Sequence, residues 1–135
     1  MKKKIIITVV LLSVLTIAVR LRFALAYMIF RGDPIRLDRS EIEYVSGTSV
    51  TAVPVRNTEM SESQVDSFAE LFNSLELKRI PVRNREKGGW LYSFYVKNKD
   101  GSAVMISFLD NGLVTVDGYD CVTLKSVPEN LEEFF

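Results

Sequence analysis

The chain has 135 residues, room for one small domain, and its 47% hydrophobic and 25% charged residues exclude a disordered or fibrous protein. It contains no histidine, which removes the commonest metal ligand and the usual general base near neutral pH. Cys121 is the one cysteine, which excludes an internal disulfide and a cysteine zinc cluster. We therefore expect no metal, no cofactor and no enzyme.

The formal net charge of zero conceals a separation of charge along the chain. Residues 1–39 carry eight basic and two acidic side chains, a charge of +6, whereas residues 40–135 carry nine basic and fifteen acidic ones, a charge of −6. A basic end suits an anionic membrane surface. An acidic remainder disfavours nucleic acid, whose binding depends on phosphates neutralised by Lys and Arg.

An apolar segment begins directly after three lysines. The uncharged run Ile5–Val19 would form a helix of about 22 Å, which is shorter than the ~30 Å hydrocarbon core but fits the apolar region of a secretory signal. Arg20 and Arg22 interrupt the run, which then resumes to Phe30. We assign residues 1–31 to a transmembrane anchor or signal segment and residues 32–39 to a juxtamembrane linker, since Pro34 disfavours helix at the residue before it.

Three interpretations of this segment compete. Residues 5–30 form one membrane helix whose arginines reach the outer head groups, or a signal peptide that is cleaved after Ala26 at Ala24-Leu25-Ala26, or a helix buried in a soluble core. The run is too apolar, and too close to the lysines, to favour burial. Lysines at the start favour a cytoplasmic N-terminus, while the arginines beyond the run count against it. We expect a single-pass membrane protein with its C-terminal domain outside, with secretion after cleavage following Ala26 as the alternative.

The domain is expected to comprise residues 40–135 and to begin with a hairpin. Alternation over residues 41–45 predicts one strand, Gly47-Thr48-Ser49 predicts a turn, and the β-branched run over residues 50–55 predicts a second strand. The capping box of Ser61 and Gln64 then begins a helix. Its apolar residues recur at steps of three and four, as Val65, Phe68, Ala69, Phe72 and Leu75.

The rest of the domain has the two-residue periodicity of strands. Alternating patterns and turn residues predict strands over residues 77–83, 90–97, 104–108 and 113–116, a further one over 122–124, and a short acidic turn of helix over 128–135. On the strongest of these strands, Trp90, Tyr92, Phe94 and Val96 are predicted to share one face. The fold class is α+β, in the order β-β-α-β-β-β with room for one more strand: a small antiparallel sheet with one helix packed on one face.

The layout resembles that of small membrane-anchored or exported extracytoplasmic domains of uncharacterised proteins from Gram-positive bacteria. The resemblance rests on the lysine-led apolar leader, the Ser-x-x-Gln helix with paired Phe, Gly88-Gly89-Trp90-Leu91-Tyr92, an Asp-Gly hairpin and Gly118-Tyr119. It implies a membrane-tethered or exported domain with no assigned activity. It supplies no catalytic residue.

Few residues suggest chemistry. A catalytic Cys121 lacks a sequence neighbour that would lower its pKa, and a single cysteine among apolar residues is more often a small buried side chain. Asp110, Asp117 and Asp120 lack the ligand spacing of a calcium loop and are better explained as turn residues. A small cell-envelope enzyme that uses carboxylates or Cys121 remains the alternative function.

The candidate interaction surface lies on the predicted open face of the sheet. Basic side chains gather in and after the strand over residues 77–83, next to side chains that alternate away from the helix on the strand over residues 90–97. The predicted surface residues are Arg79, Arg83, Arg85, Lys87, Leu91 and Tyr95. Aromatic residues and arginine favour a protein interface, and the same group suits an anionic envelope polymer or lipid head groups. A solvated face whose charges prevent edge pairing is the plain alternative. The sequence thus predicts a membrane-associated, non-enzymatic interaction module.

Overall fold

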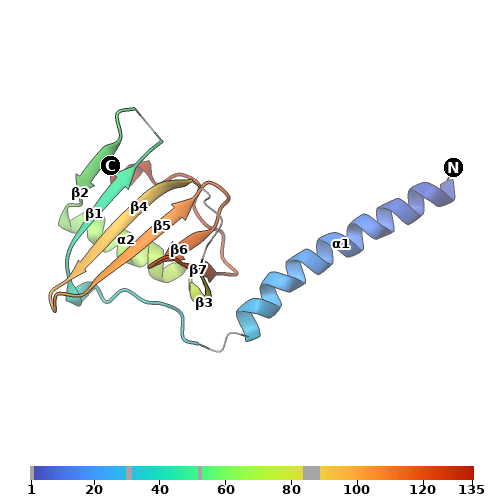
Figure 1. The fold of residues 1–135 in the computed structure, drawn as a ribbon, viewed down its shortest axis with the longest axis horizontal. Helices are drawn as coiled ribbons and strands as arrows, with labels where there is room; N and C mark the ends of the chain where they lie inside the picture. Colours follow the sequence, from blue (N-terminus) through green and yellow to red (C-terminus); the bar gives the residue numbers. More distant parts are fainter. Residues whose placement is uncertain (1, 30–31, 52, 84–88) are drawn as a thin grey trace.

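The computed structural model describes residues 2–29, 32–51, 53–83 and 89–135. The N-terminal helix α1 (Lys2–Ile29) projects away from a compact domain that holds all seven strands and the second helix, α2 (Glu62–Ser74) (Figure 1). The α+β class is confirmed. Two single-turn 3₁₀ helices, η1 (Arg39–Glu41) and η2 (Glu132–Phe134), begin and end the domain.

Helix α1 is not buried against the domain over most of its length. The window Lys2–Arg22 has a mean hydropathy of 2.3, and none of it is buried. A helix of this length and composition is sufficient to cross a membrane, and a signal sequence has the same properties. The structure does not bury Lys2–Arg22 in a soluble core, because the apolar side chains of this window are exposed.

One antiparallel sheet of seven strands forms the domain, in the order β2-β1-β4-β5-β6-β7-β3. Each neighbouring pair is antiparallel, and β3, which contains Pro81, lies at one edge of the sheet, where a proline without an amide hydrogen is tolerated. The seven strands are as many as the predicted strand ranges, whereas the predicted order left room for six. Their bounds are β1 (Ile42–Ser49), β2 (Arg56–Glu59), β3 (Lys78–Arg83), β4 (Trp90–Asn98), β5 (Ala103–Leu109), β6 (Val114–Val116) and β7 (Tyr119–Val122).

The first hairpin differs from the prediction. Strand β1 continues through Gly47-Thr48-Ser49, which were predicted to turn, and β2 begins only at Arg56. Gly47 is needed for space rather than for a turn, because a Cβ there would lie 2.9 Å from Cζ of Phe135. Ser49 is still paired with Tyr92 of β4, so the ladder extends to the end of β1.

A second hairpin also differs. The strand predicted over residues 113–116 is followed directly by a tight turn at Asp117 and Gly118, with φ of 53° and 79°, into β7. Strand β7 therefore covers Tyr119–Val122 and begins three residues before the predicted 122–124. The predicted C-terminal turn of helix is present as η2.

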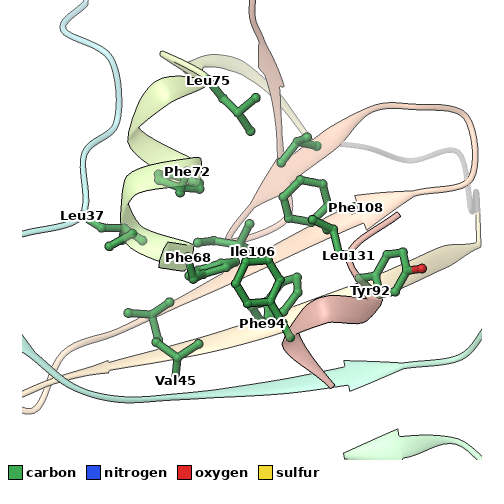
Figure 2. Packing of buried hydrophobic residues seen from close by; sticks show 14 of the residues in the cluster. Leu37, Val45, Phe68, Phe72, Leu75, Tyr92, Phe94, Ile106, Phe108 and Leu131 are labelled. Atoms are coloured by element: carbon green, nitrogen blue, oxygen red, sulfur yellow. The ribbon is translucent and has the colours of Figure 1, made fainter. Parts of the chain in front are cut away.

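Helix α2 and the C-terminal turn pack on the same face of the sheet. The capping box predicted at Ser61 and Gln64 is present. The rings of Phe68 on α2 and Phe94 on β4 lie 4.5 Å apart, and Phe134 of η2 meets Phe68 edge-on at 5.6 Å (Figure 2). All three are buried, so aromatic packing joins the helix, the sheet and the C-terminus.

The segment predicted as a juxtamembrane linker packs against the domain. The amide of Ile35 donates to the carbonyl of Leu77 at 2.7 Å. Asn73 of α2 holds the backbone of Leu37 from both sides: its Oδ1 accepts from the amide at 2.8 Å, and its Nδ2 donates to the carbonyl at 2.9 Å. Leu37 is buried, and Arg39 pairs with two acidic side chains of α2, so the domain contacts begin close to α1.

Candidate interaction surface

One face of the sheet is covered by α2 and the other is not, as Figure 1 shows for the central strands. The strand register identifies the side chains that point away from α2. We call this surface the open face. It consists of Tyr44, Ser46 and Thr48 on β1, Ser93, Tyr95 and Lys97 on β4, and Ala103, Met105 and Ser107 on β5.

An aromatic and thioether patch occupies one half of the open face. The rings of Tyr44 and Tyr95 have centroids 6.3 Å apart. Met105 lies directly opposite Tyr95 in the ladder and is 43% exposed. Exposed methionine beside tyrosine is a combination that adapts to a partner's surface, because the thioether side chain is flexible and polarisable.

Small hydroxyl side chains cross the other half. Thr48, Ser93 and Ser107 are successive partners across β1, β4 and β5. Thr48 donates to Oδ1 of Asn57 on β2 at 2.7 Å, and the hydroxyls of Ser93 and Ser107 lie 3.1 Å apart. Serine and threonine side chains are short, and these lateral hydrogen bonds join them across neighbouring strands.

The open face carries little charge. Lys97 is the one charged side chain among its nine residues, and its Nζ donates to the carbonyl of Gly101 in the same hairpin at 2.8 Å. Glu59 of β2 borders the open face beside its ladder partner Ser46. A quarter of all residues in the chain are charged, so these nine residues are depleted of charge relative to the chain. Low charge with aromatic residues and methionine is the composition of interface cores.

Arg79 lies far from Tyr95. It belongs to the edge strand β3, four strand spacings from β4, which corresponds to about 19 Å along the sheet. Its guanidinium lies 5.0 Å from the ring centroid of Tyr119 and 3.4 Å from a carboxylate oxygen of Asp117. The structure therefore does not bring these two predicted surface residues together.

The other predicted surface residues divide between three places. Arg83 ends β3, where its backbone pairs with Tyr119. Arg85 and Lys87 lie outside the described residues. Leu91 packs against the buried core, because the ladder shifts by one residue between Trp90 and Tyr92 and changes the alternation there. That same shift leaves Trp90 39% exposed, although it was predicted to share a face with the buried Tyr92, Phe94 and Val96.

Two residues of the aromatic and thioether patch were not predicted. Tyr44 alternates with Val45 in sequence as expected for a strand, but the register shift between Ile42 and Tyr44 decides which face it joins. Met105 had a usable signal, because it alternates with Val104 and Ile106 on a predicted strand. Its position beside Tyr95 depends on the β4–β5 register, which the sequence pattern leaves open.

Cys121 is poorly suited to nucleophilic catalysis. It is 4% exposed on β7, and this burial raises the pKa of the thiol to about 11, although nearby Arg79 acts in the opposite direction. The thiolate is the reactive form, so a thiol with this pKa stays protonated near neutral pH. We interpret Cys121 as a small apolar core residue.

The described residues also contain no metal-ligand cluster. Across 2–29, 32–51, 53–83 and 89–135, no group of three or more His, Cys, Asp or Glu side chains is placed to hold a metal ion. Asp117 instead ties its turn to β5, since its Oδ1 accepts from the amide of Met105 at 2.9 Å. This is the structural role expected of a turn aspartate.

Comparisons with protein-family models, curated proteins and solved structures find no match to this chain. The two features of this chain that bear on its function are the exposed window Lys2–Arg22 of helix α1 and the uncovered open face with its aromatic and thioether patch.

Proposed function

We propose that this protein is a membrane-associated interaction module whose domain binds a protein partner through the open face. The observation that carries the proposal is the group of Tyr44, Tyr95 and Met105 on the uncovered side of three central strands. An antiparallel sheet that merely faces water carries polar residues on its outer side. Here one half of the outer side carries aromatic and thioether groups, which are enriched in binding hot spots and interface cores.

Helix α1 supports a location at a membrane. We propose a single-pass protein with the domain on the outer side, because three lysines precede the apolar run. Five residues lie between Ile29 and the docked Ile35, and the six steps from one to the other span at most about 22 Å. Partner binding would then take place close to the membrane surface. Cleavage following Ala26 is the alternative, and it would release the domain.

The intact mass of the C-terminally tagged chain, recovered separately from medium, membrane and cytosol, tests this location. The full-length mass in the membrane fraction is the expected result. A mass that begins at Tyr27, found in the medium, would replace the anchor with a signal peptide.

Photo-crosslinking tests the open face. A photoreactive amino acid replaces Met105 in the full chain in its own host, and the control carries it at Glu70, on the solvent side of α2. We expect a dominant protein adduct from position 105 that is absent from position 70. Combining Tyr95→Ala with the photoreactive residue at position 105 should reduce the yield of this adduct at least tenfold. Equal adducts at the two positions, or no effect of Tyr95→Ala, would contradict the proposal, and an adduct of the chain with itself would identify a second copy as the partner.

Charge reversal of Arg79 separates the open face from the basic group predicted from sequence. Arg79→Glu leaves Tyr44, Tyr95 and Met105 unchanged, so the adduct at position 105 should persist. Loss of the adduct in this variant, with the fold intact by circular dichroism, would move the binding surface to the β3 edge.

A further inference from the structure

A cleft of about 580 Å³ lies at the end of the domain where β4 begins and β5 ends. Its walls come from the start of β4, the turn between β5 and β6, and the C-terminal segment 127–129. Tyr92 and Phe108 line the cleft, and their side chains point toward the core. Figure 2 shows both of them near Leu131, at the end of the core that is farther from Phe72. The cleft is therefore on the opposite side of the sheet from the open face, and its volume is in the range of small-molecule sites.

The lining combines an apolar floor with an acidic rim. Side chains without charge form the floor: Leu91, Tyr92, Phe108, Leu109, Val127 and Pro128. Asp110, Asn111 and Glu129 are exposed at the rim. None of the described residues that line the cleft is basic.

Backbone hydrogen bonds hold the rim in place. The amide of Asp110 donates to the carbonyl of Gly89 at 3.0 Å. The amide of Leu113 donates to Oδ1 of Asn111 at 3.1 Å, and Gly112 provides the positive φ, 78°, that the turn requires. On the opposite wall, Leu131 is buried directly after the segment 127–129. The cleft is thus formed before any ligand enters, which lowers the cost of binding.

We propose that this cleft binds an organic cation with an apolar body, such as an alkyl or aryl amine. The apolar body would cover Leu91, Leu109 and Val127, where its burial is favourable, while the ammonium group would lie beside the carboxylates of Asp110 and Glu129. A carboxylate or phosphate ligand is disfavoured by repulsion from the same rim. This site is independent of the open face and of the membrane location proposed above.

The single tryptophan reports on the cleft. Trp90 precedes Leu91 and is the ladder partner of Leu109, and both of these residues line the cleft. The full chain in detergent micelles is titrated with benzylamine at pH 7, where a primary amine is charged. Benzyl alcohol and benzoate serve as neutral and anionic probes of the same size.

We expect benzylamine to change Trp90 emission in a saturable way. Benzyl alcohol should bind at least tenfold more weakly, and benzoate should not bind. Asp110→Asn and Glu129→Gln should each weaken benzylamine at least fivefold, while Glu70→Gln on α2 should leave it unchanged. Equal binding of the amine and the alcohol, no saturable change, or no effect of either cleft variant would overturn the proposal. Near-ultraviolet circular dichroism of each variant shows that the fold is retained.

Discussion

The ring of Phe135 lies directly over the backbone of Gly47, so the last residue of the chain packs where a β1 side chain would otherwise point. A Cβ on Gly47 would be 2.9 Å from Cζ of Phe135 and 3.1 Å from Cε1 of Phe94. Phe135 also packs against Phe94, with ring centroids 5.8 Å apart. The glycine therefore makes room for the C-terminal turn on the sheet.

Gly47→Ala should destabilise the domain by about 1–2 kcal/mol, because overpacking costs more than the ~0.5–1 kcal/mol that alanine gains over glycine within a strand. Urea unfolding of the full chain in micelles, followed by Trp90 fluorescence, measures this. In the Phe135→Ala background the penalty should be smaller, since the nearer of the two obstructing rings is gone while that of Phe94 remains. An equal penalty in both backgrounds would show that the Phe135 ring is not its cause.

Glu132 should make the stability of the domain sensitive to acid. Its carboxylate accepts from Thr51, Ser49 and Tyr92 and pairs with Arg56. The hydroxyl of Thr51 and then the charge of Arg56 lower the pKa of Glu132 from its ordinary 4.5. A lowered folded-state pKa stabilises the fold above pH 4.5, and this contribution is lost as the pH falls through the folded-state value.

Glu132→Gln should therefore lower the urea concentration at the midpoint of unfolding at pH 7. Between pH 5 and pH 3, this midpoint should fall less steeply in the variant than in the parent chain. The neighbouring, exposed Glu133→Gln is the matched control and should retain the slope of the parent chain. A parent-like acid slope in Glu132→Gln would assign the acid sensitivity to other carboxylates.

Cys121 should be nearly inert in the folded protein. With a pKa of about 11, the thiolate fraction at pH 8 is about a hundredfold lower than for a thiol at the ordinary 9.0, since each unit changes it tenfold. The rate of iodoacetamide labelling, followed by mass spectrometry, should rise at least a hundredfold on adding urea. Rapid labelling of the folded chain, or loss of the cellular phenotype in a folded Cys121→Ala variant, would restore the enzyme hypothesis.

Asn73 should hold the segment after α1 onto the domain. Asn73→Ala removes both of its hydrogen bonds to the backbone of Leu37 and should cost about 1–3 kcal/mol, the range for leaving buried polar groups unpaired. Limited proteolysis should then cut within residues 32–39 at least tenfold faster than in the parent chain. The adjacent Ser74→Ala, whose hydroxyl bonds only within α2, is the control and should be cut at the parent rate.

Local patterns predicted much of the secondary structure. The apolar run after the lysines, the capping box at Ser61 and the repeat of Phe68 and Phe72 each depend on neighbours within a few residues. Both helices were therefore predicted, as was an α+β domain with an antiparallel sheet. The first hairpin was misplaced because Gly47 signals a turn in sequence, whereas its reason is a ring from the far end of the chain.

The candidate surface was predicted less well than the fold. Tyr95 lies on the open face as expected, but its neighbours there are Tyr44 and Met105 rather than Arg79 and Leu91. Membership of a shared surface requires the order of strands in the sheet and the exact register between them. A shift of one residue moves a side chain to the other face, and no local pattern encodes that shift.

The sequence by itself determined the apolar helix at the basic end, the amphipathic helix and the strand periodicity, because these follow from the chemistry of nearby residues. Only the tertiary structure decided that β3 lies at the edge opposite β2, that Phe135 covers Gly47, and that Asp110 and Glu129 face one cleft. These relationships join residues far apart in the chain, and they arise from the packing of the whole domain, which selects one strand order and one register.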